Sequence, residues 1–187
     1  NNIVFNPSGD SKVARGGLYL IAEEALGTET WRVYNNTFYG FFNYSGLVAD
    51  AFGSFGSTLN VRNNISMGGV HADFELQSTT SATNNLSSDS SGSTGLTGKA
   101  AVDQFIDSTP TVAAADLRIK SGADAKNAGA NLGTTHDVNL DIARYDRTSG
   151  TWDIGANEFV PQTVTAILPN SGPTVAGRAV TITGTNF

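Results

Sequence analysis

The chain has 187 residues, of which 15% are charged and 39% are hydrophobic, and its formal net charge is −6. This acidic balance and the scattered Lys and Arg residues exclude the basic face that duplex nucleic-acid binding requires. The absence of cysteine excludes disulfides, thiolate metal sites and a cysteine nucleophile. No apolar run reaches the roughly 18 residues that span a bilayer, so we expect no membrane span.

Turn-forming residues are abundant, with 21 Gly and many Ser, Thr and Asn, which is typical of turn-rich all-β proteins. The chain begins without Met or a signal peptide, on an Asn pair that recurs inside the sequence. We therefore expect a fragment, cut at both ends from a longer protein.

An Asn pair followed by an apolar or β-branched residue recurs along the first half of the chain. Its copies are Asn1-Asn2-Ile3, Asn35-Asn36-Thr37, Asn63-Asn64-Ile65 and Asn84-Asn85-Leu86. Asn tolerates the left-handed αL conformation better than most residues, so it suits a sharp bend between strands. Asn amides stacked from one repeat to the next can also form a hydrogen-bonded ladder. We therefore predict a structural role for these pairs rather than a catalytic one.

A second motif, a Gly followed by apolar residues, alternates with the Asn pairs. Its copies are Gly17-Leu18-Tyr19-Leu20, Gly46-Leu47-Val48-Ala49, Gly69-Val70-His71-Ala72 and the weaker Gly95-Leu96-Thr97. Two interleaved series at repeats of roughly 20–30 residues predict a β-solenoid, whose inward side chains stack in columns. The expected columns are Leu18, Leu47 and Val70, and then Leu20, Ala49 and Ala72.

Residues 70–77 alternate between apolar and polar side chains, as in a half-buried strand. Two other folds are less consistent with the pattern. Leucine-rich repeats need several regularly spaced Leu residues in each repeat, and a β-sandwich does not explain the register of the two motifs. We expect an all-β fold with about four solenoid coils over residues 1–98.

The Asn-pair coils resemble the right-handed parallel β-helix repeats of bacterial surface and secreted proteins. Five segments follow them: Leu117-Arg118-Ile119, Ser121-Gly122-Ala123, Asn127 to Leu132, Asp141 to Arg147, and Trp152-Asp153-Ile154-Gly155-Ala156-Asn157-Glu158. In this order the segments resemble the C-terminal cap of choice-of-anchor Q proteins. Gly122 and Arg144 depart from that pattern, at positions where the family has Pro and Gly. The resemblance implies a cap over residues 99–158.

The last part of the chain resembles the start of an IPT/TIG domain, an immunoglobulin-like sandwich common in cell-surface proteins. The residues that carry this resemblance are 163–173 and 180–187. It implies a linker over residues 159–162 and a partial sandwich over residues 163–187. Together the resemblances imply an extracellular or cell-surface location and a bacterial parent.

His71, Asp73 and Glu75 are the candidate catalytic residues, because they share the outward face of one predicted strand. Alternate residues of a strand lie roughly 6.5–7 Å apart, which is within the spacing of paired carboxylates in glycosidases. In the predicted register Asp50 lies beside Asp73. A half-exposed strand carries such polar residues without any catalytic role, and we favour that interpretation.

Tyr34 and Arg62 are the candidate carbohydrate-binding residues, in an outward column with Thr83. A flat strip bearing Tyr and Arg can stack on a sugar ring or pair with a uronate carboxylate. Tyr39 and Tyr44 belong to an aromatic run that offers either a sugar platform or a loop packed over its own coil.

Arg147 shares the predicted cap with three acidic residues, Asp141, Asp153 and Glu158. Charge-assisted hydrogen bonds among them can hold an irregular cap together, which we favour over Ca²⁺ coordination. His136 stands alone in the sequence. No motif of a serine hydrolase, a zinc protease or a P-loop is present, and we expect neither a metal nor a cofactor.

Two classes of function remain open. The first is a secreted or cell-surface module for adhesion or glycan binding, with a polysaccharide as its partner and no chemistry in this segment. The second is the C-terminal part of a polysaccharide lyase or glycoside hydrolase whose active site lies before Asn1. We favour the first, because binding needs only a surface whereas catalysis needs a group of charged side chains held together.

Overall fold

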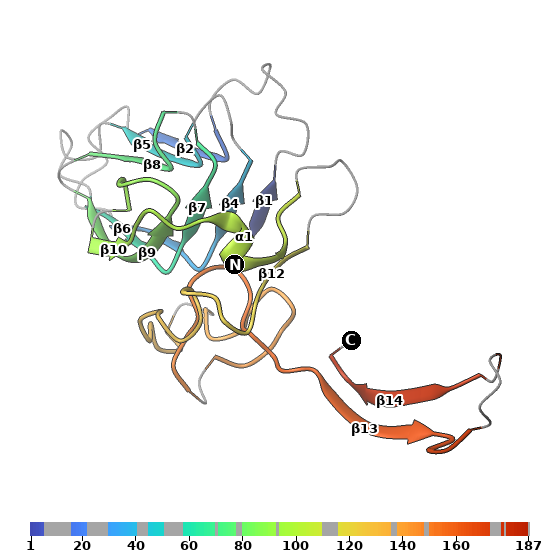
Figure 1. The fold of residues 1–187 in the computed structure, drawn as a ribbon. Helices are drawn as coiled ribbons and strands as arrows, with labels where there is room; N and C mark the ends of the chain where they lie inside the picture. The colour runs from blue at the N-terminus through green and yellow to red at the C-terminus, as the bar shows by residue number, and fades with distance from the viewer. Residues whose placement is uncertain are drawn as a thin grey trace.

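The computed structural model describes residues 1–5, 16–21, 30–40, 45–50, 58–69, 71–77, 80–92, 94–109, 116–135, 138–147, 150–172, 177 and 179–186. The fold is all-β, and the strands of its two larger sheets run parallel to one another (Figure 1). The prediction of an all-β protein is therefore confirmed. Within the described ranges no helix has the length and apolar character needed to cross a membrane.

The larger sheet has seven strands. In spatial order these are β1 (Ile3–Phe5), β4 (Thr37–Tyr39), β7 (Ile65–Met67), β9 (Ser81–Ser87), β6 (Thr58–Arg62) and β3 (Thr30–Tyr34), with β10 (Thr94–Leu96) paired to β9. A separate three-stranded sheet contains β2 (Leu18–Ile21), β5 (Leu47–Asp50) and β8 (Phe74–Leu76).

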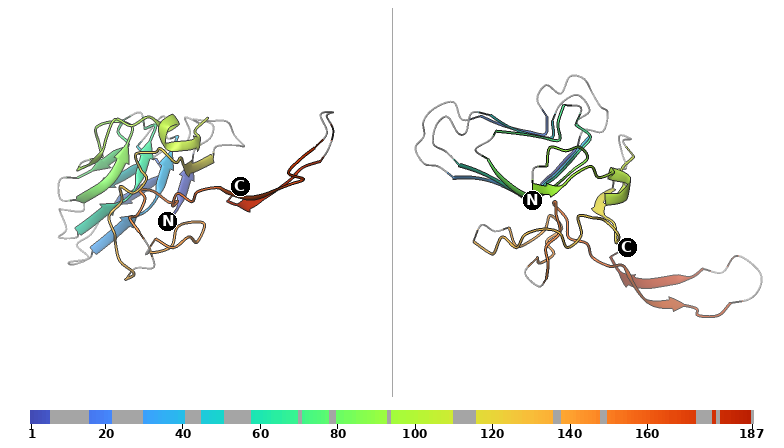
Figure 2. Two further views of the ribbon diagram at one scale, coloured as in Figure 1. Left: turned by 60° about the horizontal axis from the view of Figure 1, so that its bottom comes forward. Right: turned by 60° about the vertical axis from the view of Figure 1, so that its left-hand side comes forward.

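Strand β9 joins two halves of the larger sheet. Its residues 81–83 pair with β6, whereas Leu86 and Ser87 pair with β7. The parallel strands therefore form three sets, and each set takes one strand from each repeat: β1, β4 and β7; β2, β5 and β8; and β3, β6 and β9. The right-hand view of Figure 2 shows the three sets around a common interior.

Apolar side chains from all three sets fill this interior. The first buried cluster contains Val33, Phe38, Leu47, Ala49, Leu59, Val61, Phe74 and Ala82. The predicted columns hold between the first two repeats, where Leu18 pairs with Leu47 and Leu20 pairs with Ala49. Side chains at equivalent positions therefore stack from one repeat to the next.

The prediction for the third repeat is wrong by four residues. The strand β8 adds Phe74 and Leu76 to the two columns, in place of Val70 and Ala72; residue 70 lies outside the described residues. The backbone hydrogen bonds show the same shift in register. The Gly17 amide donates to the Gly46 carbonyl at 3.0 Å, and the Gly46 amide donates in turn to the Asp73 carbonyl at 3.1 Å. Asp73 thus occupies the position expected for the repeated glycine.

The first Asn of each internal pair forms the predicted bend. Asn35, Asn63 and Asn84 have φ values of 55°, 55° and 52°, which lie in the αL region. Each bend separates the last strand of one repeat from the first strand of the next, except at Asn84, which lies within β9. The interpretation of these residues as bends is confirmed.

The second Asn of each pair forms the predicted ladder. The Nδ2 atoms of Asn2, Asn36 and Asn64 donate to the Oδ1 atoms of Asn36, Asn64 and Asn85 at 3.1, 3.0 and 3.1 Å. The same three Oδ1 atoms also accept the backbone amides of Asn2, Asn36 and Asn64. Each rung therefore satisfies both a side-chain and a backbone donor, and the rungs from Asn36 to Asn64 and from Asn64 to Asn85 do so in the interior.

The segment after the repeats is mostly irregular. It begins with α1 (Ala101–Gln104) and the antiparallel pair β11 (Phe105–Asp107) and β12 (Asp116–Ile119). A second buried cluster joins this segment to the repeats, and it contains Tyr39, Ile65, Met67, Leu86, Phe105, Leu117, Ile119, Ala123, Ala125 and Ile154. The irregular segment thus packs against β4, β7 and β9.

The last two strands, β13 (Thr163–Leu168) and β14 (Thr181–Thr185), form an antiparallel hairpin. The hairpin extends away from the remainder of the chain in every view (Figures 1 and 2). Its apolar side chains are largely exposed, among them Val164, Ile167 and Ile182. Few described contacts hold it to the rest of the molecule, and the Tyr145 hydroxyl, which donates to Asn186 Oδ1 at 2.9 Å, is one of them.

Candidate functional site

Asp73 is a buried structural residue rather than part of an outward catalytic face. Its Oδ1 accepts the Gly69 amide at 2.8 Å, and its Oδ2 accepts the Ser88 hydroxyl at 2.6 Å and the amides of Ser88 and Asp89. Burial raises the pKa of this carboxyl, and the hydrogen bonds from Ser88 oppose that rise. Its position on the solvent face was predicted wrongly, because the strand β8 begins only at Phe74, after Asp73.

His71 and Glu75 are exposed, whereas Asp73 is buried. Glu75 accepts a hydrogen bond from the Ser45 hydroxyl at 3.1 Å. Asp50 is not beside Asp73, because β5 and β8 pair Leu47 with Phe74, four residues away from the expected register. The structure therefore places Asp73 in the interior and does not bring Asp50 beside it.

The predicted column of Tyr34, Arg62 and Thr83 is present, because β3 pairs Tyr34 with Arg62 and β9 pairs Thr83 with Arg62. A second column of Arg32, Asn60 and Ser81 runs beside it, as expected. We call these six residues the polar strip.

The side chains of the polar strip are exposed or half-buried, on a parallel sheet whose interior side is apolar. The Nε of Arg62 is buried and has no hydrogen-bond partner. A buried donor without an acceptor costs free energy, so the position of this guanidinium is not fixed by a bond from Nε.

Tyr39 lies inside the protein, not on its surface. It is 6% exposed, its hydroxyl donates to the Ser108 carbonyl at 2.6 Å, and its ring contacts Phe105 edge-on. Burial raises the pKa of the hydroxyl. The alternative in which this part of the aromatic run packs against its own protein is supported, and a sugar platform at Tyr39 is excluded. Tyr44 lies outside the described residues.

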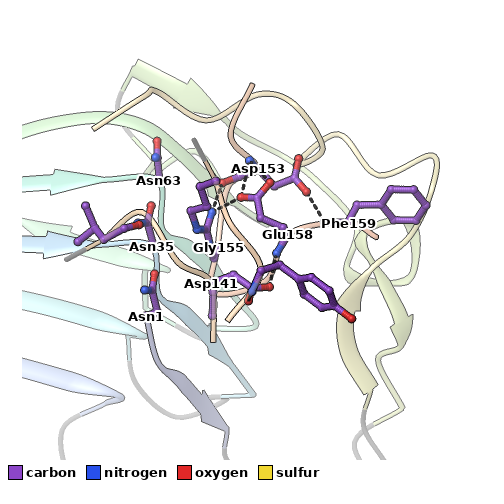
Figure 3. A network of polar contacts seen from close by, with 12 residues as sticks. Asn1, Asn35, Asn63, Asp141, Asp153, Gly155, Glu158 and Phe159 are labelled. Carbon is purple, nitrogen blue, oxygen red and sulfur yellow. Dashed lines mark hydrogen bonds and ion pairs between the residues drawn. The ribbon is translucent and has the colours of Figure 1, made fainter. Parts of the chain in front are cut away.

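Arg147 is the centre of a polar network in the irregular segment, and Figure 3 shows Asp153, Gly155 and Glu158, to which it is bound. It is 2% exposed, and it forms an ion pair with Glu158 and donates to the carbonyls of Asp153 and Gly155 at 3.1 and 2.8 Å. The Trp152 ring lies beside the guanidinium, with the ring centroid 5.8 Å away. The prediction of an Arg-centred network is confirmed for Glu158.

The other two acidic residues stabilise the network differently from the expectation. Asp153 accepts the backbone amides of Asn127 and Phe159, and Asp141 accepts those of Tyr145 and Glu158. Both carboxylates therefore fix irregular backbone, and they act on Arg147 through space rather than by a direct hydrogen bond. This is how a segment with little regular structure satisfies its buried amides.

Burial shifts the ionisation of this network. It raises the pKa of Glu158 to about 7, although the Arg147 charge opposes the rise. It also raises the pKa of Asp153 and lowers that of Arg147. The shifts share one cause: removing these charges from water costs more than their mutual attraction returns. The network thus carries a carboxyl that titrates near neutral pH.

The bend residues have a second role that the sequence analysis missed. Asn1, Asn35 and Asn63 lie in a row facing the irregular segment (Figure 3), and Nδ2 of each donates to a backbone carbonyl of that segment. The acceptors are Leu140, Val138 and Ala130, and Asn84 donates likewise to Ala128. Asn63 also accepts the Ala130 amide through Oδ1 at 2.8 Å.

Among the described residues no group of three or more His, Asp and Glu side chains is arranged to hold a metal ion. His136 lies outside those residues. The carboxylates of the Arg147 network are occupied by backbone amides and by the guanidinium.

Comparison with known proteins gave no match to any protein-family model, any curated protein or any solved structure.

Proposed function

We propose that this chain is part of a right-handed parallel β-helix module of an extracellular or cell-surface bacterial protein, and that it binds glycans without chemistry of its own. Three sets of parallel strands and an Asn ladder support the architecture. Such stacks keep side chains in fixed rows on a flat face, which suits an extended polymer.

The proposal also assigns the flanking segments. Residues 99–158 are a cap of the choice-of-anchor Q type, because they combine the D-I-G-A-N-E motif with an Arg-centred network that docks on the row of bend asparagines. Residues 163–187 are the beginning of an IPT/TIG domain. The exposed apolar side chains of the hairpin are consistent with strands that belong to a larger sandwich.

The polar strip is the proposed glycan-binding surface, and the observation that carries it is the register of Tyr34, Arg62 and Thr83. Tyrosine offers an apolar ring for the face of a sugar. The guanidinium can pair with a uronate carboxylate in two hydrogen bonds. The acidic chain as a whole still presents two arginines on this strip, Arg32 and Arg62.

A glycan array followed by calorimetric titration of each hit tests the proposal. We expect Tyr34→Ala and Arg62→Ala each to weaken binding about tenfold, which corresponds to the loss of about 1.4 kcal/mol. Arg118→Ala is the matched control, because Arg118 is an exposed arginine that pairs with Asp116 on β12. Equal affinity of all three variants would show that the strip is not the binding surface.

The enzyme alternative has its own test. The chain is incubated with pectin, alginate and chondroitin, and reducing ends and unsaturated products are measured. We expect no turnover, because Asp73 is buried and Asp50 does not lie beside it in the register of β5 and β8. Turnover that is lost in Glu75→Gln would show that this chain is an enzyme and that the proposal of a non-catalytic module is wrong.

A further inference from the structure

The outer face of the set formed by β3, β6 and β9 carries no carboxylate at the positions that the strand register aligns. Alternate residues of these strands point into the core, and the outward ones are Thr30, Arg32, Tyr34, Thr58, Asn60, Arg62, Ser81 and Thr83. All eight are exposed or half-buried. The whole chain has 17 acidic residues against 11 basic ones, so this face is opposite in sign to the protein that carries it.

The two arginines of this face are not neutralised by the described part of the chain. Three other basic residues there have a carboxylate partner: Lys99 with Asp124, Arg118 with Asp116, and Arg147 with Glu158. Arg32 donates only to the Thr30 carbonyl, at 3.3 Å. Within the described residues Arg62 has neither an ion pair nor a hydrogen bond, and of its nitrogens only Nε is buried. The outer Nη atoms of Arg62 therefore lie at the surface without a bound anion.

The strand register fixes the separation of the two arginines. Arg62 pairs with Tyr34 and Arg32 pairs with Asn60, so the arginines lie on neighbouring strands and two residues out of register. Neighbouring strands and alternate residues are spaced so that the two Cα atoms lie roughly 8 Å apart on a diagonal. Tyr34 adjoins both, because it shares a strand with Arg32 and lies opposite Arg62. The face therefore suits a polymer with spaced rather than dense negative charges.

The other groups of the polar strip favour a sugar polymer as the source of these charges. A guanidinium pairs with a carboxylate in two hydrogen bonds, and the Tyr34 ring can cover the apolar face of a sugar. The hydroxyl and amide groups of Asn60, Ser81 and Thr83 can donate to and accept from sugar hydroxyls. A nucleic acid strand carries a phosphate about every 3.4 Å. Two arginines on a chain of net charge −6 would leave most of those phosphates without a counter-charge.

We propose that the polar strip selects a linear polysaccharide of uronic acids. Arg32 and Arg62 bind two carboxylates of the same polymer, and Tyr34 lies against a sugar ring beside them. This inference rests on the proposed glycan-binding function and specifies its ligand. It also makes Arg32 a residue that determines specificity for acidic over neutral glycans.

The test compares hexamers of galacturonate and of mannuronate with their methyl esters, by titration calorimetry on the whole chain. Esterification removes the negative charge and leaves the rings and hydroxyls in place. We expect a free acid to bind at least tenfold more tightly than its ester. Arg32→Gln and Arg62→Gln should each weaken binding of the free acid about tenfold and reduce its dependence on salt concentration. Arg118→Gln is the control and should bind as the wild type, because Arg118 is paired with Asp116.

A variant that adds a charge provides an independent test. Ser81 pairs with Asn60 in the column of Arg32, so Ser81→Glu places a carboxylate on the polar strip without removing an arginine. We expect it to weaken binding of the free acid about tenfold and to melt within about 4 °C of the wild type, because the position is a half-buried outward one. Unchanged binding by Ser81→Glu would contradict the proposal.

The remaining outcomes separate this inference from the proposed function. Glycan binding on the array without preference for the free acids leaves the proposed function standing and shows that the acidic class is wrong. No binding of any glycan contradicts both. An oligothymidylate hexamer that binds as tightly as the free acids would show a surface for anions in general, and wild-type binding by Arg32→Gln would exclude the role of Arg32.

Discussion

The two asparagines of each pair carry out different tasks with the same side chain. The first adopts αL and uses its amide to hold the irregular segment, as Asn63 does through Ala130. The second is in the interior and bonds to the next repeat, as Asn64 does to Asn85. The two side chains are identical, so the backbone conformation at each position determines which hydrogen-bond partner the side-chain amide reaches.

Replacement of Asn64 by Ala should lower the melting temperature. The variant leaves the Asn36 backbone amide without its acceptor in the interior, and it removes the Nδ2 donor from the Val33 carbonyl and from Asn85 Oδ1. We expect a loss of at least about 2 kcal/mol, or roughly 4–8 °C. Thermal denaturation followed by circular dichroism measures the change, with Asn131→Ala as the exposed control. A melting temperature equal to that of the control would show that the ladder does not stabilise the fold.

The Glu158 carboxyl makes stability depend on pH in an unusual direction. Its pKa is about 7 in the folded protein and 4.5 as the ordinary value. Between these values the folded state binds more protons than the unfolded state, so the free energy of unfolding falls as pH rises. The contribution of Glu158 to the free energy of unfolding is lost once the pH is well above 7, and it amounts to roughly 3 kcal/mol.

Urea unfolding of the wild type and Glu158→Gln at pH 4.5, 6 and 7.5 measures this contribution. We expect the wild type to lose more stability than the variant as the pH rises across this window. Parallel pH profiles for the two proteins would show that Glu158 does not titrate there.

Residue patterns predicted the asparagine bends and the ladder because both arise from contacts between equivalent positions of neighbouring repeats. The bond from Asn63 to Ala130 joins residues 67 apart and meets an irregular segment that has no periodicity. Asp73 was misplaced for a related reason, since its partners Ser88 and Asp89 belong to a turn without a repeated motif. Contacts between a repeat and a unique segment leave no periodic signal in the sequence.

At the scale of elements, Gly155 shows how closely the irregular segment approaches the sheet. It has φ of +103°, and an added Cβ would lie 2.7 Å from Ile65 Cδ1 and 2.9 Å from Thr37 Oγ1. Its amide donates to the Asn63 carbonyl at 2.8 Å, and the neighbouring Ala156 amide donates to Thr37 Oγ1. The contact depends on the absence of a side chain at this position.

Gly155→Ala should therefore destabilise the protein by at least about 2 kcal/mol, because it adds a clash to a strained φ. Two controls separate these causes. Gly133 has φ of +70° with open space around its Cβ position, so Gly133→Ala should cost about 1 kcal/mol. Gly150→Ala has open space and no positive φ, and should have little effect. Chemical denaturation gives the three values, and equal effects in Gly155→Ala and Gly133→Ala would show that the sheet contact is loose.

At the scale of the whole molecule, the hairpin contributes little to the stability of the rest. Its strands are exposed, and a two-stranded hairpin alone is marginal in water. We expect a chain that ends at Gln162 to melt within about 2 °C of the full chain. Limited proteolysis should remove the hairpin first, at the exposed Pro161 and Gln162. A melting temperature lowered by many degrees would show that the hairpin is an integral part of the fold.

The ladder of asparagines has a direction. Every rung sends its amide hydrogens toward higher residue numbers, and the last Nδ2, on Asn85, ends on the Val61 carbonyl at 2.9 Å. If one amide in the row, such as that of Asn64, were turned over, its nitrogen would face the nitrogen of Asn36 and its oxygen would face the oxygen of Asn85. Each amide orientation is therefore fixed by the two neighbouring amides, and the orientation of the whole row changes together or not at all.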